Sequence, residues 1–205
     1  LPEVATIFLQ AGVPHPRAVP HEVRSPIKQL FQKGVARTTF DLERYYTDLA
    51  YEAGACIMLV DRPILDGAVF AGVSVKKFCE EYVPEEVYGE KNIGPEHKRP
   101  EKVFDRYRAI IHISSAAVKS PEEYEKIKRR ENPFNIDTAA EAREFDAKLL
   151  EVYSGHPRRI IIPADGSFER KARECCRLIE SLLEENPPIP NSPPAEPVTR
   201  VIACS

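Results

Sequence analysis

Ala55-Cys-Ile-Met-Leu-Val-Asp-Arg-Pro-Ile-Leu-Asp-Gly67 is the stretch that decides the fold, because six apolar residues run directly into the acid-base pair Asp61-Arg62. Six apolar residues without alternation are typical of a strand that is buried on both faces, as in a parallel sheet. Open α/β sheets bind their ligands at the carboxyl ends of such strands. The stretch therefore predicts an α/β domain with Asp61 and Arg62 at its ligand site.

Two further apolar runs extend this pattern along the chain. Ala109–Ser114 and Arg159–Ile162 are each followed by helical spacing, and no hairpin signal joins the strands. Strands that alternate with helices predict a doubly wound parallel sheet. Only three strands are visible, and we expect a strand before Leu1 to supply the deficit.

Helical spacing and cap residues place the expected helices between and around these strands. The predicted helices are Leu1–Gly12, Ser25–Gly34, Thr38–Ala53, Ser74–Tyr82, Pro121–Arg130, Thr138–Gly155 and Ser167–Leu182. The polar stretch 84–101 has little periodicity and predicts an irregular insertion.

Composition limits the classes of protein that the chain can belong to. The formal net charge is -3, which argues against a nucleic-acid binder. The five cysteines lack any Cys-x-x-Cys pair, so neither a disulfide framework nor a zinc site is indicated. No apolar run reaches the length of a membrane span and no signal peptide is visible, so we expect a cytoplasmic protein.

The carboxyl-terminal part of the chain differs from the rest in composition. Six prolines fall within the twelve residues from Asn186 to Pro197, which is typical of a linker or a tail. We therefore expect one domain over residues 1–185 and a Pro-rich tail or linker over residues 186–205.

The pair Asp61-Arg62 is the best candidate for chemistry. Asp61 can accept a proton from a substrate hydroxyl or hold a magnesium-bound water, and Arg62 offers a planar fork to a phosphate. The alternative is that Asp61 pairs locally with Arg62 or caps the next turn, and spacing alone leaves both open. Asp66 and Gly67 are expected to shape the turn beyond, where Asp66 can also reach a substrate.

A second candidate is the basic group around Arg129 and Arg130, which Arg143 extends onto the next predicted helix. Two basic helices joined by a loop can close over a triphosphate as a lid. Most runs of charged residues, however, are solvated helix faces. No segment has the Gly-x-x-x-x-Gly-Lys-Ser/Thr phosphate loop, since Val73 stands where Gly67–Ser74 would need its lysine. No histidine has a partner at metal-ligand spacing, and His112 is expected to be a core histidine.

Several motifs together resemble a known family. In order they are Pro2-Glu3-Val4-Ala5-Thr6, Asp61-Arg62 with Asp66-Gly67, Asn132-Pro133, Ile136-Asp137-Thr138, Glu141-Ala142, Asp146 and Gly155-His156-Pro157. This series is similar to the AAA-type P-loop domain of the NadR ribosylnicotinamide kinases and the insect TRPL-translocation-defect GTP-binding protein. The similarity runs from Leu1 to about Leu183.

The resemblance implies a nucleoside-kinase-like P-loop fold whose first strand and Walker A loop precede Leu1. It implies magnesium with ATP or GTP as cofactors. It also assigns roles to residues: Asp61 and Arg62 are catalytic, Glu3 and Asp66 bind substrate, Arg129, Arg130 and Arg143 belong to a lid, and Asp165, Gly166 and Ser167 lie near the nucleotide base.

Two functions remain open from the sequence. The first is a purine-nucleotide-binding NTPase or small-molecule kinase-like domain that acts on a small acceptor and is inactive without its phosphate loop. The second is a non-catalytic module that recognises GTP or phosphoinositide, with an anionic lipid as partner. A third possibility is a degenerate fragment that has no independent function.

Overall fold

The sheet of this protein is parallel throughout. The computed structural model describes residues 21–53, 57–89, 94–131, 138–185 and 200–204. Its four-stranded sheet has the order β1-β4-β2-β3, and every pairing is parallel. The strands are β1 (Ile57–Asp61), β2 (Tyr107–Ile113), β3 (Arg159–Ile162) and β4 (Arg200–Cys204). The prediction of a mixed α/β fold with a parallel sheet is confirmed.

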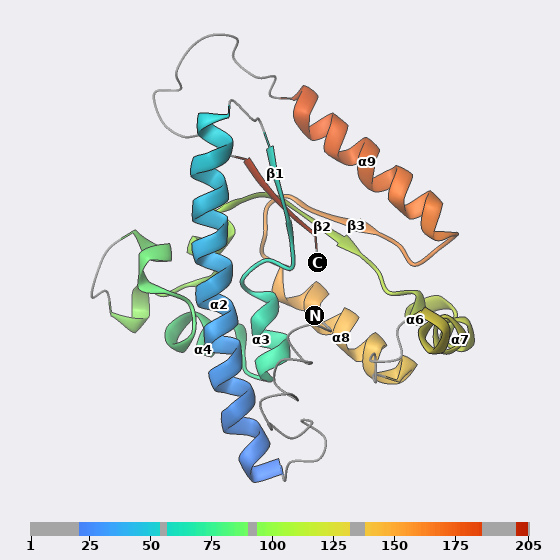
Figure 1. Ribbon diagram of the computed structural model, residues 1–205, viewed down its shortest axis with the longest axis horizontal. Helices are drawn as coiled ribbons and strands as arrows, with labels where there is room; N and C mark the ends of the chain where they lie inside the picture. The colour runs from blue at the N-terminus through green and yellow to red at the C-terminus, as the bar shows by residue number, and fades with distance from the viewer. Residues whose placement is uncertain (1–20, 54–56, 90–93, 132–137, 186–199, 205) are drawn as a thin grey trace.

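Helices cover both faces of this sheet, as Figure 1 shows. The helical segments are α2 (His21–Glu52), α3 (Asp66–Ala71), α4 (Val75–Glu81), η2 (Glu85–Tyr88), η3 (Pro95–His97), α5 (Pro100–Phe104), α6 (Ala116–Lys119), α7 (Pro121–Glu131), α8 (Ala139–Val152) and α9 (Phe168–Glu184). None of the helices within the described ranges is long and apolar enough to cross a membrane.

Two hydrophobic cores lie on opposite faces of the sheet because successive strand residues point in opposite directions. Ile110 of β2 packs in the larger core, with side chains from α2, α3, α4, α5 and the end of α8. Its neighbours Ala109 and Ile111 pack in the smaller core, where α9 contributes Leu182 and Ile179. The connections from β1 to β2 and from β2 to β3 therefore cross the face of the larger core. The connection from β3 back to β4 crosses the face of the smaller core.

Helix α2 is longer than the sequence predicts. The predicted break at Gly34 is wrong, because one helix runs from His21 to Glu52. Ala36, Phe40 and Glu43 are buried along one side of it at helical spacing. A helical glycine costs about 1 kcal/mol relative to alanine. Burial of an aromatic side chain contributes about 1.5–3 kcal/mol, which is enough to keep the helix continuous.

Three described helices, α4, α8 and α9, start at the predicted caps. Ser74 accepts a hydrogen bond from the N–H of Lys77 at the start of α4. Thr138 and Glu141 form the predicted capping box at the start of α8. Ser167 caps α9. Local side-chain chemistry therefore sets these helix starts, and the predicted helix Leu1–Gly12 lies outside the described residues.

Strand β4 joins the two halves of the sheet. Its five residues pair with β1 on one side and with β2 on the other. Residues 200–204 were expected in a tail or linker, whereas the structure places them inside the sheet. The division of the chain into domains stays a prediction.

Candidate functional site at the carboxyl edge of the sheet

Asp61 and Arg62 lie where the sequence predicts them, at the carboxyl end of β1. Asp61 is the last residue of the strand, and both side chains are exposed. Arg62 has a φ of 64°, and no other non-glycine residue within the described ranges has a positive φ. Left-handed backbone is uncommon for residues other than glycine, asparagine and aspartate, and it costs roughly 1 kcal/mol or more. The chain therefore turns sharply between the two candidate residues.

The Arg62 side chain lies over an aromatic pair. Its guanidinium carbon is 4.9 Å from the centre of the Phe70 ring, and that ring stacks on Phe145 of α8 at 5.5 Å. A cation over an aromatic face gains about 0.5–1 kcal/mol at an exposed site. The side chain is still 59 % exposed, so it is oriented by Phe70 and open to an anionic ligand.

Asp66 is buried beneath this surface, at the start of α3. Its Oδ1 accepts a hydrogen bond of 2.9 Å from the hydroxyl of Tyr153, while its Oδ2 has no hydrogen-bond partner and lies 4.0 Å from the Arg62 guanidinium. Burial raises the pKa of Asp66 to about 7, against the lowering effects of Tyr153 and Arg62. The carboxyl thus supports the turn from within, and its predicted contact with substrate stays a prediction.

A buried polar network fixes the loop between Arg62 and α3. The backbone N–H of Ile64 donates to the Tyr107 hydroxyl at 3.1 Å, and this hydroxyl donates to Oε1 of Glu43 at 2.8 Å. Arg106 donates to the other Glu43 oxygen at 2.8 Å. Burial raises the pKa of Glu43, although Arg106 and Tyr107 oppose the shift. Residues from α2 and β2 therefore hold the loop that follows Asp61.

Gly67 lies in the first turn of α3 and lets this helix pack closely against α4. A Cβ at this position would lie 2.4 Å from the tip of the Phe78 ring. Gly67 was expected to shape the turn, and close packing against α4 is the reason for glycine here.

The carboxyl end of β2 is occupied by internal contacts. His112 is buried, with its Nε2 3.2 Å from Oδ1 of Asp146, and the same oxygen accepts the N–H of Ser115 at 2.7 Å. The prediction that His112 is a core histidine is confirmed. Asp146 therefore connects α8 to the end of the central strand.

The carboxyl end of β3 lies farther along the same edge. Asp165 forms an ion pair of 2.5 Å with Lys119, which lowers the pKa of this carboxyl. Gly166 has a φ of 80°, and Ser167 caps α9. Two strands separate β3 from β1, so this loop lies about 14 Å from Asp61 at ordinary strand spacing.

The remaining predicted site residues are not brought to Asp61 by any described contact. Arg143 is exposed on α8. Arg129 and Arg130 belong to the backbone of α7, but their side chains lie outside the described residues, as does all of Glu3. The predicted lid therefore stays a prediction.

No match to this chain was found among protein-family models, curated proteins or solved structures. The described part of the chain contains no group of three or more histidine, cysteine or acidic residues that could hold a metal ion. Magnesium bound with substrate phosphates needs only one or two carboxylates, so Asp61 alone is compatible with it.

Sequence reasoning missed the residues that support the site. Phe70 contacts it from α3, and Tyr107 and Tyr153 contact it from much later in the chain. Each reads in the sequence as an ordinary core aromatic. The supporting role of Glu43, on the predicted helix Thr38–Ala53, was not predicted either. An acid surrounded by apolar helical positions was the one local sign that its carboxylate needs a buried partner.

Proposed function

We propose that this protein is a nucleotide-binding domain of the doubly wound, P-loop kinase-like class, and that it holds a phosphorylated ligand at the carboxyl edge of its sheet. One observation carries the proposal. Arg62 follows the end of a parallel strand in left-handed conformation, with its guanidinium oriented by Phe70 and still exposed. The planar, bidentate fork of an arginine matches the geometry of a phosphate group.

Asp61 gives the proposed site its second function. Its exposed carboxylate lies beside Arg62 in the chain, so a ligand phosphate at Arg62 would bring a hydroxyl or a magnesium ion within its reach. Magnesium, if bound there, would neutralise phosphate charge, with Asp61 as its protein ligand. Asp61 would otherwise accept the proton of an acceptor hydroxyl.

The buried network explains why the site is held in place without a ligand. Glu43 and Tyr107 anchor the loop after Arg62, and Tyr153 anchors Asp66. A preformed site of this kind loses little conformational freedom when it binds. This supports ligand binding rather than a purely local ion pair between Asp61 and Arg62.

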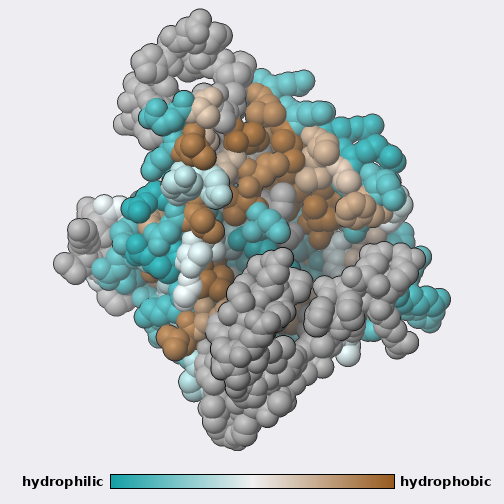
Figure 2. Space-filling view, in the orientation of Figure 1, coloured by the Kyte–Doolittle hydropathy of each residue, from teal (hydrophilic) through white to brown (hydrophobic). Residues whose placement is uncertain are grey.

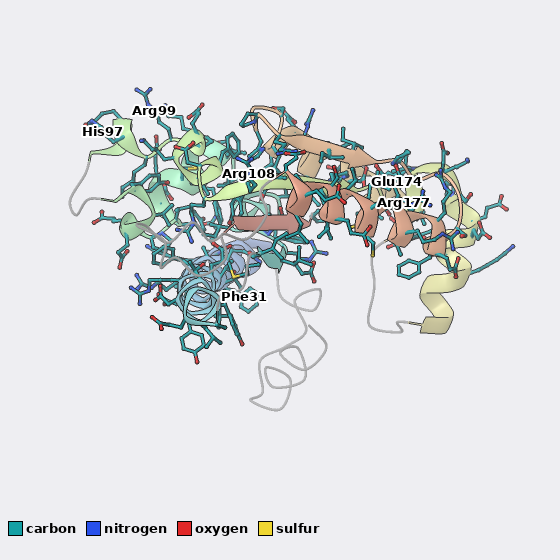
Figure 3. All side chains as sticks on the ribbon, turned by 90° about the horizontal axis from the view of Figure 1, so that it is seen from above. Phe31, His97, Arg99, Arg108, Glu174 and Arg177 are labelled. Carbon is teal, nitrogen blue, oxygen red and sulfur yellow. The ribbon has the colours of Figure 1, made fainter. Side chains whose placement is uncertain are left out.

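Titration of the 205-residue chain with fluorescent ATP and GTP analogues, with and without magnesium, tests the proposal. We expect saturable binding that falls about tenfold or more in Arg62→Gln, because a charge-assisted hydrogen bond contributes about 1.5–3 kcal/mol. Arg99→Gln is the matched control and should bind normally. Figure 3 shows Arg99 beside His97, at the far end of the molecule from Glu174 and Arg177 of α9.

Two results decide against the proposal. One is the absence of saturable binding up to millimolar nucleotide, and the other is an equal loss in Arg62→Gln and Arg99→Gln. Phosphate release measured in the same samples separates a catalyst from a binding module. Binding without product is expected, because the chain has no Gly-x-x-x-x-Gly-Lys phosphate loop.

A further inference from the structure

The carboxyl of Asp66 is buried next to Arg62 and only half of it is satisfied. Its side chain is 3 % exposed. Tyr153 donates to Oδ1, whereas Oδ2 has no hydrogen-bond partner within the described ranges. The Arg62 guanidinium lies 4.0 Å from Oδ2, which is too far for a hydrogen bond. A bare ionised oxygen is costly to bury, so a charge on Oδ2 depends on Arg62 for stabilisation.

The other charged and titratable groups around Asp66 and its loop come from several elements. They are Arg62 and Asp61 at the end of β1, His112 on β2, Asp146 on α8, Tyr153 just after α8, and Glu43 on α2.

Only some of these groups can change when a ligand arrives at the surface. Burial raises the pKa of Asp66, and Asp61 adds to this effect. Tyr153, Arg62 and His112 lower the pKa of Asp66. Tyr153 and His112 are buried and hold internal partners. Arg62 is therefore the group through which a ligand can act on the buried carboxyl.

Arg62 is placed so that it can exchange Asp66 for another anion. Its side chain is 59 % exposed, and its guanidinium carbon lies 4.9 Å from the centre of the Phe70 ring. Figure 2 shows hydrophobic residues gathered over β1 and the adjoining part of α2. Apolar surroundings screen charges less than water does. A ligand that pairs with Arg62 therefore affects Asp66 without touching it.

We propose that an anionic ligand and the ionised carboxylate of Asp66 compete for Arg62, so that the ligand binds with uptake of one proton from solvent at Oδ2 of Asp66. The inference rests on the proposed function, because it takes the ligand to be a phosphate group at Arg62. Asp66 acts on the ligand through Arg62 and is a positioning residue. No covalent bond to the ligand forms or breaks.

The direction of the pH dependence follows from the charges. A phosphate at Arg62 offsets the guanidinium charge, and this raises the pKa of Asp66 above its value of about 7 in the free chain. A ligand that raises this pKa binds the protonated form more tightly. Affinity should therefore be high below pH 7 and fall as the pH rises above it. Because Arg62 is more than half exposed, we expect a fall of about tenfold, at the low end for charges this close.

Carbon-13 NMR of the Asp66 carboxyl in the full 205-residue chain tests the competition directly. Its titration midpoint is measured between pH 5 and pH 9, with and without saturating ATP, in EDTA to exclude magnesium. We expect ATP to raise the midpoint by about one pH unit. Arg62→Gln should raise it without any ligand, because the neighbouring cation is gone. The exposed carboxyl of Asp105 is the internal control and should not respond.

The pH profile of ATP binding gives a second measurement. The phosphates of ATP themselves titrate near pH 6, so the dissociation constant of the native chain is divided by that of Asp66→Asn at each pH. We expect this ratio to rise about tenfold from pH 5.5 to pH 8.5. Asp105→Asn in place of Asp66→Asn should give a ratio close to one throughout. A merely structural role for Asp66 would change the affinity by the same factor at every pH.

Three results would overturn the competition for Arg62. They are a midpoint of Asp66 that saturating ATP leaves unchanged, a midpoint that Arg62→Gln leaves unchanged, and a ratio that is flat with pH. In each case, saturable binding that requires Arg62 would leave the proposed function standing. Absence of saturable ATP binding would overturn both.

Discussion

Asp66 should make the stability of this protein fall as the pH rises toward neutrality. Its pKa is about 7 in the folded state and about 3.9 in an unfolded chain. The folded state therefore binds the proton more tightly. The resulting stabilisation is complete below about pH 4 and is lost as the pH rises through 7. The full shift corresponds to about 4 kcal/mol, of which about 2 to 3 kcal/mol is lost between pH 5 and pH 8.

Asp66→Asn isolates this effect, because asparagine keeps the shape and the acceptor for Tyr153 but does not titrate. Urea unfolding at pH 5, 6, 7 and 8 gives the free energy of unfolding of the variant minus that of the native chain. We expect this difference to rise by about 2 to 3 kcal/mol from pH 5 to pH 8. Asp105→Asn changes an exposed carboxyl and should give a flat difference. A flat difference for Asp66→Asn as well would refute the assignment of a raised pKa to this residue.

Substitutions at three further positions are tested by urea unfolding at constant pH. Gly67→Ala should destabilise by about 1–3 kcal/mol, because its Cβ would overlap Phe78; an unchanged midpoint would contradict this close approach. Tyr107→Phe should cost about 1–3 kcal/mol, because Glu43 loses a buried donor and the loop after β1 loses its acceptor; a neutral result would show that water replaces the hydroxyl. Thr138→Ala removes a capping box and should cost about 0.5–2 kcal/mol, whereas Thr138→Ser should be close to neutral.

The strands were predictable because each leaves a local trace in the sequence. Ile57–Asp61 and Arg159–Ile162 could be recognised as strands by their apolar runs without alternation, but the expected burial of both faces is wrong, because Leu59 is 53 % exposed and Ile161 is 45 % exposed. Asp61 and Arg62 could be placed at the sheet edge for the same reason, since the end of the apolar run marks the end of the strand.

The support of the site depends on contacts between residues that are distant in sequence. Tyr153 reaches Asp66 across 87 residues, and Tyr107 reaches Glu43 across 64. No local pattern encodes such pairings, because each residue alone fits an ordinary core position. The positive φ of Arg62 could not be predicted for a related reason. The surrounding packing imposes this backbone conformation on arginine, a residue that does not favour it.

Strand β4 also has consequences for the order in which the protein can fold. It separates β1 from β2 in the sheet, yet it is made about ninety residues after β2. At about 5–20 residues per second, a ribosome needs several seconds to add that length. During this interval β1 and β2 have no strand between them, and their facing edges are open to other chains. The nascent protein should therefore depend on chaperones until residues 200–204 have emerged.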